Sequence, residues 1–140
     1  RFEILNETYV KKLQIEARII GDICLNHVIP AAVKYQNTLI ENVKGIKEIF
    51  GEAYLNFCAS EIETLKAIST SINSLSSYVD ELVEARKRAN RVQNIAERAK
   101  MYSHEVFELM GCVRTHADNL EMLIDDEIWP LPKYRELLFF

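Results

Sequence analysis

Apolar side chains recur along this chain at three- and four-residue steps, the spacing that places residues on one face of an α-helix. The first stripe begins after Asn6, a residue favoured at helix N-caps. Its period resumes beyond Pro30 and continues to Gly51, a glycine placed where a helix ends. A proline removes a backbone donor and disfavours helical geometry in the residue before it. The pattern therefore predicts a helix over about 7–50, kinked or broken at Pro30. Its apolar positions are Val10, Leu13, Ala17, Ile20, Cys24, His27 or Val28, Ala32, Tyr35, Leu39, Val43, Ile46 and Phe50.

A second stripe runs without proline through the middle of the chain. The segment 71–77 is poor in helix formers, but the apolar phase passes through it unchanged, so we predict one long helix over about 54–101. Its apolar positions are Leu55, Ala59, Ile62, Leu65, Ser69, Ile72, Leu75, Val79, Leu82, Ala89, Val92, Ala96 and Ala99.

A third stripe predicts a last helix over 104–126, with Ser103 as its N-cap. A turn near 102 would lay the basic stretch 84–91 beside 115–122, close to the acidic residues of 118–127. Surface ion pairs contribute only about 0–1 kcal/mol each, so they would select the register rather than drive folding. The apolar positions are Val106, Leu109 or Met110, Val113, Ala117, Leu120 and Ile124.

These stripes predict an all-α fold in which residues 1–140 form a single helical domain. We expect an antiparallel bundle of three long helices, or four if the first is broken at Pro30 into 7–29 and 31–50. An irregular tail, 127–140, contains the prolines Pro130 and Pro132.

The composition is that of an ordinary soluble protein, with 49% apolar and 27% charged residues among 140. A net charge of −4 gives no support for nucleic-acid binding, and no apolar run is long enough to span a membrane. The three cysteines are too few for a disulfide framework, so we expect a reducing, cytoplasmic setting. The chain begins Arg-Phe-Glu without Met, and we expect a piece of a longer protein.

Most motifs that carry catalytic chemistry are missing from the sequence. It contains no glycine-rich phosphate loop, no HExxH and no Glu-x-x-His. Cys112 and His116 share a helix face and offer at most two metal ligands, while Cys24 and His27 fit the apolar core better than a metal site. We therefore expect no catalytic, cofactor-binding or metal-binding residue in this chain.

Two charged clusters are candidate binding sites. The run EARKRANR, 84–91, winds around its helix, and Glu84 is placed to pair with Arg88, which favours a solvated face over an anion site. The acidic residues 125–127 could hold Mg²⁺ or Ca²⁺, but pairing with Lys87, Arg88 or a partner's basic residues is the better interpretation.

The tail WPLPKYRELLF, 129–139, is the strongest candidate for an interface. Its prolines restrict the unbound backbone, and Trp, Tyr and Arg are enriched at interface hot spots. The tail either packs on its own bundle or docks onto another domain or subunit, and composition does not choose between these. The candidate interface residues are Trp129, Pro130, Leu131, Pro132, Tyr134, Arg135 and Leu138.

Several stretches together resemble the C-terminal helical region of type III glutamine synthetases, the large bacterial form of that enzyme. These stretches are IPAAVKYQ (29–36), GIKEIFG (45–51), EARKRAN (84–90) and LEMLIDDEIWPLPKYRELLF (120–139). The most specific of them is DDEIWPLPKYRELLF, and the resemblance covers nearly the whole chain.

The resemblance implies a parent enzyme of nitrogen metabolism that joins ammonia to glutamate, using ATP and Mg or Mn, in a double-ringed homo-oligomer. The family's metal, ATP and ammonia residues lie in domains upstream, and nothing in this chain matches them. The implied partners are those catalytic domains and neighbouring subunits, with a role in packing or assembly. The alternative is a free-standing helical interaction module.

Overall fold

The computed structural model describes the backbone of residues 2–124 and the side chains of residues 6–124. All of its regular elements are helices, in the order α1 (Phe2–Ile23), η1 (Cys24–Val28), α2 (Ile29–Phe50), η2 (Gly51–Tyr54), α3 (Leu55–Arg91), α4 (Ile95–Met101), η3 (Tyr102–Val106) and α5 (Phe107–Leu123). The predicted all-α class is confirmed.

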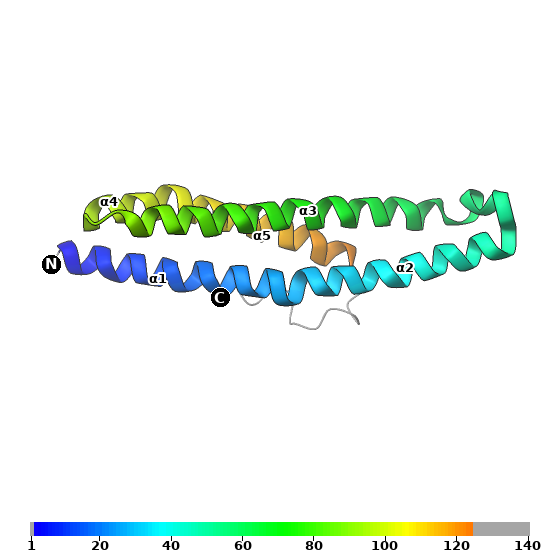
Figure 1. Cartoon of the computed structure of the whole chain (residues 1–140), viewed down its shortest axis with the longest axis horizontal. Helices are drawn as coiled ribbons and strands as arrows, with labels where there is room; N and C mark the ends of the chain where they lie inside the picture. The colour runs from blue at the N-terminus through cyan, green and yellow to red at the C-terminus, as the bar shows by residue number, and fades with distance from the viewer. Residues whose placement is uncertain (1, 125–140) are drawn as a thin grey trace.

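Two long rods dominate the described part of the molecule. The first comprises α1, η1 and α2, and α3 runs back alongside it, while α4, η3 and α5 return along only part of that length (Figure 1). The predicted bundle of three long helices is therefore wrong in its details, because the last segment consists of shorter pieces and leaves the end nearest the α2–α3 turn uncovered.

The first rod passes Pro30 without breaking. Ile29 keeps helical dihedrals, φ −63° and ψ −46°, and its N–H donates to the Cys24 carbonyl five residues earlier. This π-helical turn directly precedes the proline, whose missing donor and ring are hardest to fit inside a regular α-helix. The expectations that Pro30 would break the helix and would move Ile29 out of helical geometry are thus wrong.

The spacing of buried residues accounts for the π-turns. Ile20, Cys24, Val28 and Ala32 are all buried at successive steps of four. Four residues exceed one α-helical turn, so a strict four-residue repeat drifts around a regular helix, and a wider turn corrects the drift. Tyr102, Val106 and Met110 repeat the same step across the second π-turn, η3.

The turn between the two rods occurs at Gly51, where the sequence predicts the end of a helix. Gly51 has φ 59° and ψ −134°, and its N–H donates to the carbonyl of Lys47. Backbone of this kind strongly favours glycine, so the interpretation of Gly51 as a helix stop is confirmed. Beyond it, α3 continues through 71–77 as expected, with one irregular residue, Cys58 (φ −137°, ψ 24°).

The second turn is not where the sequence predicts it. The helix expected over 54–101 ends at Arg91, and α4 begins after Asn94, whose side chain accepts a hydrogen bond from the Glu97 N–H at 3.0 Å. Asn94 and Glu97 have the spacing of a capping box, a signal that outweighs the predicted Ser103 cap. Residues 101–106 are helical throughout, so no turn occurs near 102.

Two glycine-to-alanine substitutions, at Gly51 and at Gly45, are expected to change the stability of the chain in opposite directions. Gly51→Ala should destabilise the chain by about 1–3 kcal/mol, because alanine is strained at this positive φ. Gly45→Ala, inside α2 with open space around a new Cβ, should stabilise it by about 0.5–1 kcal/mol. Urea denaturation of both variants checks the pair, and equal effects would contradict it.

Candidate functional site

The tail residues predicted as an interface lie outside the residues that the structure describes. This holds for Trp129, Pro130, Leu131, Pro132, Tyr134, Arg135 and Leu138, and also for the acidic residues 125–127. The described surface offers three other features to consider. These are a polar junction near the start of α1, an apolar turn between the rods, and an uncharged belt between these two.

The polar junction joins three helical segments through one amide. Asn90 Oδ1 accepts hydrogen bonds from Gln14 Nε2 of α1 at 2.8 Å and from the Tyr102 hydroxyl of η3 at 2.6 Å. Tyr102 is completely buried, so its hydroxyl needs a partner of this kind. The junction therefore fixes α3 against both neighbours, which is a structural role.

Asn90→Ala should cost about 1 kcal/mol of stability, the usual net value of one hydrogen bond, because water can reach the exposed end of the junction. Both Asn90→Ala and Tyr102→Phe remove the hydrogen bond between these two side chains. In a double-mutant cycle, Asn90→Ala should therefore cause little further loss of stability in the Tyr102→Phe background. Chemical denaturation of the four proteins measures this. Fully additive losses would show that the two side chains act independently.

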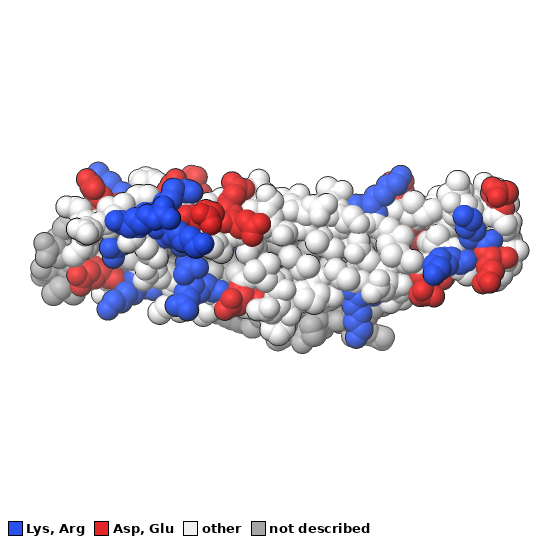
Figure 2. Space-filling model, viewed as in Figure 1, with Lys and Arg blue, Asp and Glu red and all other residues white. Residues whose placement is uncertain are grey.

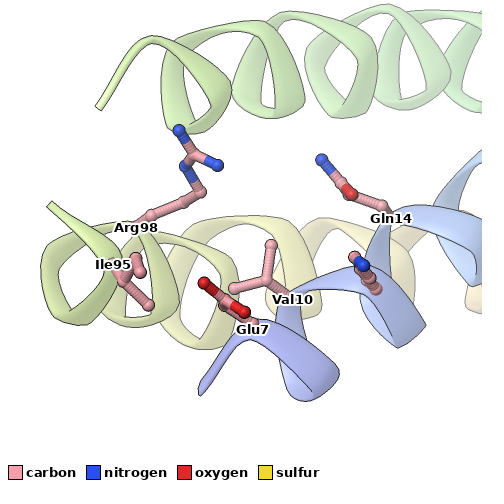
Figure 3. Close-up of a pocket in the computed structure, with 6 residues that line it drawn as sticks. Glu7, Val10, Gln14, Ile95 and Arg98 are labelled. Atoms are coloured by element: carbon pink, nitrogen blue, oxygen red, sulfur yellow. The ribbon is translucent and has the colours of Figure 1, made fainter. Parts of the chain in front are cut away.

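A pocket of about 280 Å³ lies beside the junction, between α1 and α4 (Figure 3). Its polar lining comes from Glu7, Lys11, Gln14 and Arg98, and its apolar lining from Val10 and Ile95. Arg98 Nε donates to the Val92 carbonyl at 2.8 Å, which caps the end of α3. The Arg98 guanidinium is thus largely used in holding the end of α3 and the turn that follows it.

Among the described residues, no group of three or more His, Cys, Asp or Glu side chains is placed to hold a metal ion. His116 Nδ1 lies 2.8 Å from the Cys112 carbonyl, and its ring packs against Tyr78 with centroids 4.7 Å apart. Cys24 is buried as expected, but His27 is exposed. The prediction of His27 in the core is wrong, and Val28 takes that position.

The basic stretch 84–91 is a salt-bridged surface, but with other partners than predicted. Glu84 pairs with Lys87 at 3.4 Å rather than with Arg88, and Arg88 lies 3.7 Å from Glu105. The early turn at 92–94 shifts the register, so this stretch does not lie beside 115–122. Both pairs are well exposed and give no anion-binding groove.

The turn between the two rods, which we call the hairpin tip (residues 47–57), carries an exposed apolar cluster. Phe50 and Phe57 stack with ring centroids 4.1 Å apart, and both are about half exposed. Ile49 is 77% exposed and Leu55 is 53% exposed. Large apolar side chains gathered at one exposed place are typical of a docking surface.

The arm that carries this tip has a thin core. Within residues 33–70, all of which are described, Cys58 and Ile68 are the buried residues. The predicted stripe positions of the arm are partly buried or exposed, in contrast to the fully buried positions where α5 covers the rods. Two helices alone cannot enclose a core, so the arm exposes apolar surface that a further element would cover.

An uncharged belt crosses the middle of both rods. Residues 23–33 and 67–79 contain no Asp, Glu, Lys or Arg. Hydrogen bonds from Gln14 to Asn90 and from Gln36 to Ser69 set the antiparallel register that brings these runs side by side. Figure 2 shows the result, a central area without charged side chains between two charged ends. No helix among the described residues is both long and apolar enough to cross a membrane.

Comparisons with known proteins agree with one another. The family model for the glutamine synthetase C-terminal domain matches residues 1–47. A glutamine synthetase of Bacteroides fragilis is 48% identical over 140 residues, and a type-3 glutamine synthetase of Dictyostelium discoideum is 30% identical over 141. A glutamine synthetase of Butyrivibrio fibrisolvens is 28% identical over 139 residues.

Each of these alignments covers 99% of the chain but 19% of the relative. The chain thus spans about a fifth of the length of the curated relatives it matches. The matched domain model and the three relatives carry the same enzyme name, which is also the family that the quoted stretches resemble. The chain therefore belongs to the family of glutamine synthetase C-terminal domains.

Proposed function

We propose that this chain is the C-terminal helical domain of a type III glutamine synthetase and serves in domain packing or oligomer assembly rather than in catalysis. The observation that carries the proposal is the 48% identity to a glutamine synthetase along 99% of the chain. The relative from Dictyostelium, named a type-3 enzyme, supports the subclass.

The parent reaction in this proposal is the ATP-dependent ligation of ammonia to glutamate in the cytoplasm, with Mg or Mn as the metal. In this proposal, the groups that bind ATP, glutamate and metal lie in other parts of the parent chain. The described surface supports the packing role, because the exposed cluster of Ile49, Phe50, Leu55 and Phe57 is chemically suited to a protein partner. The partners are the catalytic domains and neighbouring subunits of the homo-oligomer.

Calorimetry on the 140-residue chain tests the non-catalytic role. Titration with ATP and Mg²⁺, and separately with glutamate, should release no binding heat, while the protein encoded by the complete gene should form glutamine from glutamate, ammonia and ATP. Stoichiometric nucleotide binding by the 140-residue chain would overturn the proposal. An encoding gene without an upstream ligase region would favour the free-standing interaction module instead.

A further inference from the structure

We propose that a small hollow between α1 and α3, lined by Arg18 and Arg86, binds an inorganic oxyanion of the size of phosphate. This inference goes beyond the proposed function, because domain packing requires no bound ion. It rests on two arginines that line one hollow from different helices, on a buried nitrogen of Arg86 without a hydrogen-bond partner, and on the size of the hollow.

The hollow has a volume of about 150 Å³ and lies where α1 and α3 run side by side (Figure 1). Arg18 of α1 and Arg86 of α3 contribute two positive charges to its lining, and Asp22 of α1 contributes one negative charge. The charged lining is therefore positive overall. The rest of the lining is apolar or small, and consists of Ala17, Gly21, Leu25, Val79, Leu82 and Val83.

Arg86 differs from its neighbours in the basic stretch 84–91. Arg88 of this stretch pairs with Glu105 at the surface, whereas Arg86 lines the hollow. The Nε of Arg86 is buried and has no hydrogen-bond partner among the described residues. A buried donor without an acceptor is costly, so nearly all such groups in native proteins are paired. A small rotation of the guanidinium would turn this N–H toward an acceptor in the hollow.

The lining itself leaves at least one arginine without a carboxylate. Asp22 is the acidic residue of the hollow, and in the described part of the chain no ion pair joins it to Arg18 or Arg86. Even if Asp22 turned toward one guanidinium, the other would keep its donors. The planar guanidinium fork donates two parallel hydrogen bonds to an oxyanion, so an anion between the two arginines suits this lining.

The size of the hollow selects a small ion. A water molecule occupies about 30 Å³ in the liquid, so a hollow of about 150 Å³ has room for roughly five non-hydrogen atoms. Phosphate, a phosphorus atom with its oxygens, is of this size, and a peptide segment is larger. Arg18 is exposed and Arg86 is partly exposed, so each pair with the ion stays in contact with water. Such pairs are weak, and we expect a dissociation constant in the millimolar range.

NMR spectroscopy of the ¹⁵N-labelled 140-residue chain tests the proposal, because the Nε–H group of an arginine gives its own signal. The Arg86 signal is identified by its loss in Arg86→Lys. Titration with sodium phosphate should shift this signal, and the backbone amide signal of Gly21, along a saturating curve. Sodium chloride at the same ionic strength should give no saturating shift of either signal.

Charge variants at the hollow should change the affinity for phosphate in opposite directions. Arg18→Gln removes a charge-assisted hydrogen bond and should weaken binding about 10-fold or more. Asp22→Asn removes the carboxylate that repels the ion and should tighten binding. Arg88→Gln is the matched control, since it removes a positive charge of the same helix outside the hollow and should leave the affinity unchanged. Far-UV circular dichroism checks that each variant remains helical.

Three results would overturn the proposal. A shift that grows linearly with phosphate and is matched by chloride would mean an adventitious ion only. A saturating shift with the same affinity in Arg18→Gln would place the ion elsewhere on the chain. A shift of the Arg86 signal caused by Asp22→Asn alone, with no response to phosphate, would identify Asp22 as the partner of Arg86.

Discussion

Replacing Tyr102 with alanine is expected to destabilise the chain by about 3–5 kcal/mol, the range for deleting a large buried aromatic side chain. Tyr102 is completely buried in η3, among residues of α1 and α3, and its hydroxyl donates to Asn90. Small domains are stable by about 5–15 kcal/mol in total, so this one change can remove much of the margin. Urea denaturation followed by far-UV circular dichroism measures the loss.

Two further variants separate the causes of that loss. Tyr102→Phe keeps the ring and should cost about 1 kcal/mol, the value of the hydrogen bond. Tyr9→Ala removes a tyrosine that is 39% exposed on α1 and should cost much less than Tyr102→Ala. A small effect of Tyr102→Ala, similar to that of Tyr9→Ala, would contradict the packing described for η3.

A charge at the hairpin tip is expected to disrupt assembly of the full-length protein while leaving this domain folded. Phe57→Glu places a carboxylate in the stacked pair with Phe50, where a docked partner would have to desolvate it. Interface hot spots of this type cost about 2–4 kcal/mol or more when altered, a 30-fold or larger weakening. Size-exclusion chromatography with light scattering reports the oligomer, and the melting temperature of the 140-residue chain reports folding.

Met122→Glu is the matched control, since Met122 is 77% exposed on α5, away from the tip. It should leave the oligomer intact. If the oligomer is unchanged in Phe57→Glu, the tip is not part of the assembly surface. The assignment to the glutamine synthetase family does not depend on this result. A large fall in the melting temperature of the 140-residue chain would instead mean that Phe57 supports the turn itself.

The sequence predicted most of what depends on repeated spacing. The stripe positions Val10, Leu13, Ala17 and Ile20 are buried, as are Val113, Ala117 and Leu120 at the other end of the chain. Gly51 ends its helix because only the glycine backbone accepts that turn easily. Such features are local, so they can be inferred without knowing what packs against them.

What the sequence left unresolved depends on competition between local signals and tertiary packing. Pro30 is a helix breaker in isolation, but a four-residue apolar repeat and a π-turn carry the rod past it. Ser103 and Asn94 are both acceptable N-caps, and only Asn94 has Glu three residues later. The error at this turn also displaced the predicted ion pairs, because every contact beyond it inherits the wrong register.

The surface features were harder still to foresee. A stripe residue such as Leu55 has the same spacing as Leu75, yet Leu55 is 53% exposed and Leu75 is buried. The difference arises because α5 covers one part of α3 and not the other. Periodicity identifies which face of a helix is apolar, but the length of the neighbouring segment decides how much of that face is enclosed.

The wide turns at Cys24–Val28 and Tyr102–Val106 have a consequence for how this domain tolerates changes in length. Each holds an additional residue within a continuous helix, so removal of one residue there can restore regular winding while the flanking faces keep their orientation. At the first site this would bring the ring of Pro30 against an α-helical carbonyl, which is unfavourable. Tyr102–Val106 is therefore the place in the described helices where a one-residue deletion is best accommodated.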